Sequence, residues 1–295
     1  MTNAPINFKQ ERDFGDLFNA TFGFISQEFK KLGTAILYFV VPFLLLASIA
    51  MTIYAVKAQE LSQSIVQGDK PDPLIAFKTM GSLFGYIGVG LLLSLIATTV
   101  LMSTVYGYIK LYIQKGSDGF SLNDVWGQVA RTFFPFVGAT IVVGLLIVAG
   151  AIFCLLPGIY LAVALSVVLC IMIFEEVSFS VAFSRSFKLV KNNWWSTFAV
   201  FLVATIIVYI LSILVSIPSL LMGFESMFSN LKAGQPILGA NFSMGFYIVS
   251  AFTRLFTQVF MVIPVVITAF LYFSFVEKAE SPSLVNRIDQ IGENV

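Results

Sequence analysis

The stretch "TFFPFVGATIVVGLLIVAGAIFCL", residues 132–155, decides the class of fold. It carries no charged side chain, and it is long enough to cross the roughly 30 Å hydrocarbon core of a bilayer as a single helix. Soluble helical proteins rarely contain an uncharged apolar run of this length. The stretch therefore predicts a helix that spans a membrane.

Similar apolar runs lie on both sides of this stretch. The composition agrees with a membrane protein, because 58% of the residues are hydrophobic and 11% are charged, against about 45–50% and 25% in soluble domains. The predicted fold is an all-α, polytopic membrane protein with six transmembrane helices. The expected spans are residues 34–56, 81–109, 132–155, 158–174, 195–217 and 245–276.

The segments between and around the spans complete the predicted organisation. The Leu-Pro-Gly sequence at 156–158 predicts a tight hairpin between the third and fourth spans. The sixth run exceeds one straight span, and Pro264 is its expected kink site. Residues 1–33 are expected to form an N-terminal cytoplasmic segment with an amphipathic interface helix, residues 34–276 the bundle, and residues 277–295 a cytoplasmic tail.

Basic residues predict that both termini lie in the cytoplasm, because cytoplasmic segments of membrane proteins are enriched in Lys and Arg. In this orientation twelve basic residues are inside, namely Lys9, Arg12, Lys30, Lys31, Lys110, Lys115, Arg131, Arg185, Lys188, Lys191, Lys278 and Arg287. Four are outside, namely Lys57, Lys70, Lys78 and Lys232.

Composition also argues against several classes of function. The formal net charge of +1 argues against a general nucleic-acid partner. The chain has no histidine, which removes the commonest general base and metal ligand. Cys154 and Cys170 both fall in apolar runs, so we expect buried thiols and no disulfide. Since no catalytic motif is found, we expect no enzyme activity, no cofactor and no metal.

The charged segment "FEEVSFSVAFSRSFKLVKNNWWSTF", residues 174–198, lies between two apolar runs. Its helical spacing predicts an amphipathic interface helix with a basic polar face, followed at once by the fifth span. Tryptophan favours the headgroup region, so Trp194 and Trp195 mark the entry to that span. The predicted apolar stripe is Phe179, Ala182, Phe183, Phe187, Val190 and Trp194.

The N-terminal segment carries a comparable stripe, displaced by 165 positions. At this offset Phe14, Phe18, Phe22, Ile25 and Phe29 meet Phe179, Phe183, Phe187, Val190 and Trp194. A weaker copy, "GFSLNDVWGQVARTFFPF", precedes the third span. The pattern predicts three repeats of an interface helix plus a helical hairpin. The alternative stays open, because any aromatic amphipathic helix before a span looks similar.

The segment at 155–195 resembles the glycerophosphoryl diester phosphodiesterase membrane-domain family and related uncharacterised six-span bacterial membrane proteins. The matching residues are Pro157-Gly158, Glu175-Glu176, Ala182, Arg185-Ser186 and Trp194-Trp195. The resemblance implies a multi-pass protein of the bacterial inner membrane. It does not imply phosphodiesterase activity, which in the named members belongs to a separate soluble domain that we do not expect here.

The acidic pair Glu175 and Glu176 is the first candidate site. Acids at the end of a span oppose the helix dipole and need partners or water, and we favour a structural pairing with Arg185 over a proton site. Arg185, Lys188 and Lys191 are also candidate contacts for anionic lipid on the cytoplasmic side. The positive-inside bias alone produces the same residues.

Arg254, with Gln258 one turn later, is the second candidate site. An arginine inside a membrane is costly, and it suggests a site for an anionic substrate or a lipid headgroup. The favoured alternative is that the sixth span starts later and that Arg254 reaches the outer interface.

These observations favour a non-enzymatic inner-membrane protein that serves as a scaffold, as an accessory subunit of a membrane complex, or in envelope maintenance. The competing hypothesis is a transporter or lipid-handling protein with a cavity between the repeats. The expected partners are the lipid bilayer, including anionic lipids on the cytoplasmic side, and other membrane proteins.

Overall fold

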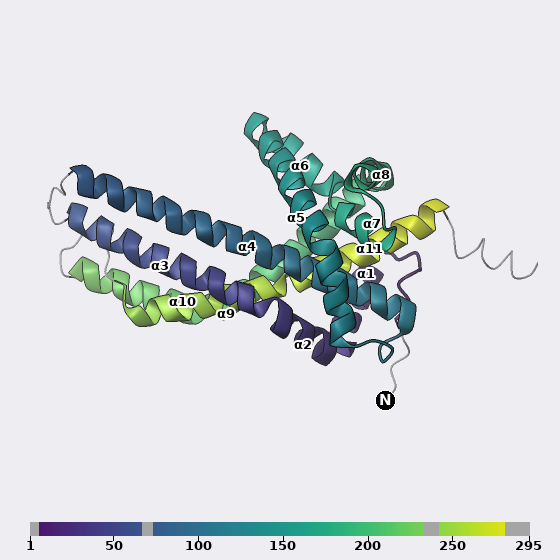
Figure 1. The fold of residues 1–295 in the computed structure, drawn as a ribbon, viewed down its shortest axis with the longest axis horizontal. Coiled ribbons are helices and arrows are strands. Elements are labelled where there is room, and N and C mark those ends of the chain that lie inside the picture. Colours follow the sequence, from purple (N-terminus) through teal and green to yellow (C-terminus); the bar gives the residue numbers. More distant parts are fainter. Residues whose placement is uncertain (1–5, 67–72, 233–241, 281–295) are drawn as a thin grey trace, which may run out of the picture. The chain divides into compact units, whose positions relative to one another are not determined.

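The computed structural model describes residues 6–66, 73–232 and 242–280, and every regular element in these ranges is an α-helix (Figure 1). Lys70, Arg287 and residues 281–295 of the expected tail lie outside the described residues. The helices are α1 Phe14–Gln27, α2 Phe29–Phe39, α3 Val41–Val66, α4 Pro73–Lys115, α5 Leu122–Phe153, α6 Leu155–Ala164, α7 Val168–Phe174, α8 Phe179–Lys191, α9 Trp194–Lys232, α10 Met244–Phe260 and α11 Val262–Glu280.

Six segments of the described chain are long and apolar enough to cross a membrane, which confirms the predicted all-helical class and the number of such segments. Their ends differ from the predicted ones, because several helices continue beyond the most apolar window. The segments are Val41–Ser64, Phe77–Lys115, Leu122–Phe153, Leu155–Phe174, Trp194–Lys232 and Met244–Glu280.

The helices are grouped in two compact units. The first unit holds Met1–Phe39, Thr99–Ile206 and Val262–Val295, and the second holds Val40–Thr98 and Ile207–Met261. The first unit contains all the charged clusters described below.

Prolines explain where several helices begin. A proline donates no N–H, and its ring clashes with the carbonyl four residues earlier, so it is tolerated mainly in the first turn of a helix. The first predicted span is divided at Val40, just before Pro42, into α2 and α3. The sixth run breaks at Met261, three residues before the expected kink at Pro264.

Two other prolines lie inside continuous helices. The fifth predicted span, expected to end at Ile217, continues through Pro218 as α9 as far as Lys232. The weaker third interface helix is not a separate element, because α5 runs without a break from Leu122 to Phe153 and contains Pro135. These prolines therefore do not end their helices.

The hairpin of α5 and α6 is closed by one residue, Cys154, in an extended conformation. The turn was expected at 156–158, but those residues begin α6. The two helices lie side by side (Figure 1), and a Cβ on Gly158 would lie 2.8 Å from the Cβ of Ala151. Both cysteines are free, but Cys154 is exposed, contrary to expectation, because it lies at the tip of the hairpin.

Helix α8 packs against α6 and α7 through small side chains. Its buried residues include Ala182 and Ser186, whereas Phe183 and Phe187 of the predicted stripe are only half-buried. Those two rings contact each other with centroids 5.2 Å apart. Ala182 and Val190 of the predicted stripe are therefore buried. The buried face also includes Ser186, whose hydroxyl donates to the Ala164 carbonyl at 2.6 Å.

The core of the first unit lies around α11, most of which is buried. The ring of Phe8, before α1, stacks on Phe270 of α11 with centroids 4.2 Å apart. Phe24 of α1 meets the same cluster edge-on, 5.1 Å from Phe8. This aromatic cluster holds the N-terminal segment against α11.

Candidate functional site

A charged network surrounds the end of α7, where the acidic pair Glu175 and Glu176 lies. Glu175 is the C-cap residue of α7, and its Oε1 accepts hydrogen bonds from Arg185 Nε at 2.6 Å and from the Tyr272 hydroxyl at 2.8 Å. Arg185 also donates through Nη2 to Glu280 at 2.7 Å. The expected pairing of Glu175 with Arg185 is present, and it joins α7, α8 and α11.

The second acid of the pair points to a different helix. Glu176 has a left-handed backbone conformation, with φ of 55°, which is uncommon for a residue other than glycine. Its carboxylate accepts from Lys110 Nζ of α4 at 2.6 Å. The same ammonium donates to the Ile173 carbonyl at 3.0 Å, so Lys110 also satisfies a carbonyl that the end of α7 leaves without a helical partner.

The ion pairs of the network shift the pKa of Glu176 and of Arg185 in favour of their charged forms. The hydrogen bond from Lys110, together with its positive charge, lowers the pKa of Glu176. Burial alone would lower the pKa of Arg185, but its bonds to Glu175 and Glu280 outweigh this effect and raise it. The network is therefore suited to holding helices together, because each of these charges has an opposite charge beside it.

Lys188 and Lys191 do not join this network. Both side chains are exposed on α8. Lys188 and Arg185 line an open cavity of about 420 Å³. Lys191 belongs instead to a second pocket, at the junction between α8 and α9.

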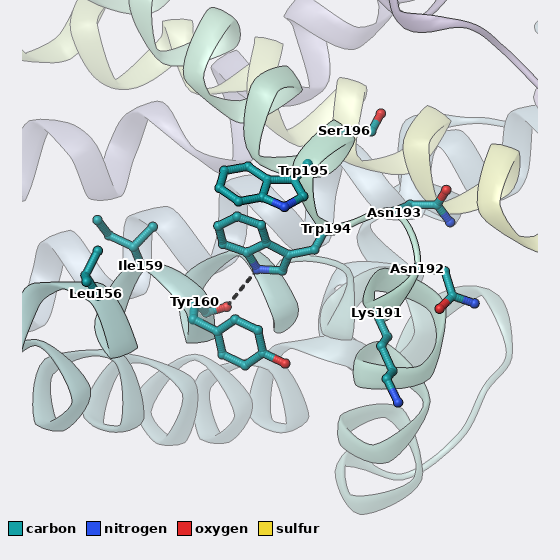
Figure 2. Close-up of a pocket in the computed structure, with 9 residues that line it drawn as sticks. All are labelled: Leu156, Ile159, Tyr160, Lys191, Asn192, Asn193, Trp194, Trp195 and Ser196. Carbon is teal, nitrogen blue, oxygen red and sulfur yellow. Dashed lines mark hydrogen bonds between the residues drawn. The ribbon is translucent and has the colours of Figure 1, made fainter.

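Figure 2 shows this second pocket, of about 520 Å³, lined by residues of α6, α8 and α9. The Trp194 ring stacks on Tyr160 with centroids 6.0 Å apart, and Trp194 Nε1 donates to the Tyr160 carbonyl at 3.5 Å. Leu156 and Ile159 lie on one side of the rings, and Lys191 lies on the other together with two asparagines (Figure 2). The pocket therefore has an apolar side and a polar side.

Arg254 and Gln258 lie on α10, in the second unit. The Arg254 side chain is exposed. Gln258 donates through Nε2 to Thr98 Oγ1 of α4 at 2.9 Å. Gln258 thus ties α10 to α4.

A further polar cluster, which the sequence did not indicate, lies where α1 meets α2. Glu28 is 2% exposed, and its Oε2 accepts from the Tyr108 hydroxyl at 2.6 Å and from Ser117 Oγ at 2.9 Å. The available signal was positional, because Glu28 continues the buried series Leu17, Thr21 and Phe24 at steps of three and four. A carboxylate in such a series predicts a buried charge.

Comparison of the chain with protein-family models, with curated proteins and with solved structures found no match.

Proposed function

We propose that this chain is a non-enzymatic, multi-pass protein of the bacterial inner membrane that acts as a scaffold or accessory subunit of a membrane complex, or in envelope maintenance. The observation that carries the proposal is the charged network at the end of α7. Its acids and bases form ion pairs between helices, as a rigid framework requires. A transport path would instead need charged groups that can release their partners.

The apolar surface of α5 supports a role in assembly. Only 17% of its spanning window is buried, and large side chains such as Leu145, Ile152 and Phe153 are exposed. This surface must be covered by lipid or by other membrane proteins. A scaffold uses part of such a surface to hold its partners.

Native co-purification in a mild detergent tests the proposal. Mass spectrometry of the purified sample should identify one or more other membrane proteins in a fixed ratio to this chain. The control is an unrelated six-span protein carrying the same affinity tag. Recovery of the chain alone, from several detergents that keep it folded, would refute the scaffold role.

The internal repeat is part of this proposal, and the helix bounds support it. At the predicted offset of 165, the first residue of α1, Phe14, meets the first residue of α8, Phe179, and Phe29 of α2 meets Trp194 of α9. Buried positions also coincide, since Leu17 and Thr21 correspond to Ala182 and Ser186. Each of these two repeats then begins with an interface helix, α1 in the first and α8 in the second.

The proposed orientation places both termini, α1 and α8 on the cytoplasmic side. A variant with Asn192→Cys, in a background of Cys154→Ser and Cys170→Ala, tests it. The new thiol, which is exposed at the end of α8, should react with a membrane-impermeant reagent only from the cytoplasmic side. Reaction in intact spheroplasts would reverse the assignment. The resemblance to the phosphodiesterase membrane-domain family agrees with this location and remains part of the proposal.

Lipid handling is a second candidate function, favoured by the pocket in Figure 2. A pocket with Leu156 and Ile159 on one side and Lys191 on the other suits an amphiphile. Trp194→Ala should reduce the amount of phospholipid that co-purifies with the chain. The control is Trp126→Ala, which removes a 47% exposed tryptophan on α5. Equal lipid content in the two variants would argue against this function.

A further inference from the structure

Glu28 is a buried carboxylate that forms no direct ion pair with any described residue. Both of its hydrogen-bond donors, the hydroxyls of Tyr108 and Ser117, are neutral. None of the ion pairs between described residues includes Glu28. Buried carboxylates are normally paired, because removing an isolated charge from water is costly. Glu28 therefore lacks a direct cationic partner among the described residues.

Lys31 is close to this carboxylate but is already engaged. Its ammonium forms an ion pair with Asp118 at 2.5 Å. It also donates to the Ser117 carbonyl at 2.8 Å and to Ser117 Oγ at 2.9 Å. Lys31 thus reaches Glu28 only through the Ser117 hydroxyl. It orients Ser117 but makes no direct ion pair with Glu28.

A cavity of about 590 Å³ opens beside Glu28. Its lining includes Asp118 and the exposed Lys30, which takes part in none of the ion pairs between described residues. Glu28 is the C-cap residue of α1, and Lys30 lies two positions later in the first turn of α2. Phe29, which is 69% exposed, also lines the cavity. The cavity thus offers the buried carboxylate of Glu28, the exposed ammonium of Lys30 and an apolar ring, beside the Lys31–Asp118 ion pair.

We propose that this cavity binds the headgroup of a phospholipid that carries a primary ammonium, such as phosphatidylethanolamine. The ammonium supplies the missing positive charge to Glu28 and has N–H donors for its carboxylate. The phosphate is then attracted to Lys30, and the acyl chains begin beside Phe29. A quaternary ammonium has no N–H donor, so phosphatidylcholine fits the site less well. This inference concerns different residues from the proposed scaffold role and does not depend on it.

The experiment measures which lipids the full chain retains. The purified protein is reconstituted in nanodiscs with equal amounts of phosphatidylethanolamine, phosphatidylcholine and phosphatidylglycerol, and the retained lipids are quantified by native mass spectrometry. The primary ammonium can donate a charge-assisted hydrogen bond to Glu28, and the quaternary ammonium cannot. We therefore expect phosphatidylethanolamine to be retained about tenfold over phosphatidylcholine. Equal retention of these two lipids, or preferred retention of phosphatidylglycerol, would overturn the proposal.

Matched variants locate the site. Glu28→Gln keeps an acceptor for the two hydroxyls and removes the charge, so it should abolish the preference, whereas Glu60→Gln removes an exposed carboxylate and should not. If Glu28→Gln does not fold, Lys30→Gln supplies the test, because its exposed side chain is not needed for packing. Lys30→Gln should lower retention of phosphatidylethanolamine severalfold. The control is Lys9→Gln, which removes an exposed lysine that does not line the cavity. A wild-type preference in every folded variant would place the lipid elsewhere.

Soluble phosphoethanolamine distinguishes the lipid from its free headgroup. It has the same ammonium and phosphate but no acyl chains to lie beside Phe29. Millimolar phosphoethanolamine should therefore leave the retained lipid unchanged in the same nanodiscs. Displacement of the lipid by the free headgroup would show that the acyl chains add nothing to binding, contrary to the proposal.

Discussion

Ser186→Ala is the most direct test of how α6, α7 and α8 are held together. Ser186 is fully buried, and its hydroxyl donates to the carbonyl of Ala164, the last residue of α6. In a continuous helix this carbonyl would accept from the amide of Val168, but that amide donates to Leu165 instead, at 3.2 Å. The substitution therefore leaves a buried carbonyl unpaired.

The cost of one unpaired buried carbonyl is about 1–3 kcal/mol. The equilibrium constant for unfolding should rise roughly five- to 150-fold. Unfolding in mixed micelles with increasing SDS, followed by circular dichroism, measures this change. The matched control is Ser184→Ala on the same helix, whose exposed hydroxyl makes a 3.3 Å bond to the Ser180 carbonyl. The control should change the free energy of unfolding by less than about 0.5 kcal/mol. Equal effects of the two substitutions would refute the assignment of Ser186 as the partner of the α6 carbonyl.

Two further predictions concern the hairpin and the charged network. Gly158→Ala should reduce the free energy of unfolding by about 1–3 kcal/mol, because the new Cβ would overlap Ala151. The control is Gly144→Ala, whose Cβ would have nothing within 4 Å. It should be neutral or stabilising in the same denaturation assay. The pKa of Glu176 is lowered in the folded state by Lys110, so its stabilisation is present above the unfolded pKa of about 4.3 and is lost as the pH falls through the folded value. Denaturation at pH 7 and at lower pH should show this loss in the wild type and a smaller one in Glu176→Gln; identical pH profiles would contradict the ion pair.

The spans were predictable because their signal is local. An apolar window such as 132–155 reports directly on burial in a bilayer. The ends were less predictable, since a helix continues for as long as its backbone hydrogen bonds are satisfied, as α9 does beyond Pro218. The break between α6 and α7 has no proline or glycine in the segment 165–167. At this break the Ser186 hydroxyl of α8 donates to the Ala164 carbonyl, a contact between residues 22 positions apart.

The candidate sites show the same division. The bond between Glu175 and Arg185 was predicted, because the two residues are only ten positions apart and a short turn between their helices can bring them together. Lys110 was predicted only to lie on the cytoplasmic side with the other basic residues, although it is the partner of Glu176. That contact joins residues 66 positions apart, and neither helical period nor charge pattern indicates such a pair.

The one-residue connection between α5 and α6 has a consequence for how the chain enters the membrane. The tip consists of Cys154 flanked by Phe153 and Leu155, which are 90% and 68% exposed, and it bears no charge. Moving one charged residue into a bilayer costs about 2.5–3.5 kcal/mol on the insertion scale, and this tip avoids that barrier. The two helices can therefore be inserted together as a closed pair, with no hydrophilic loop to translocate.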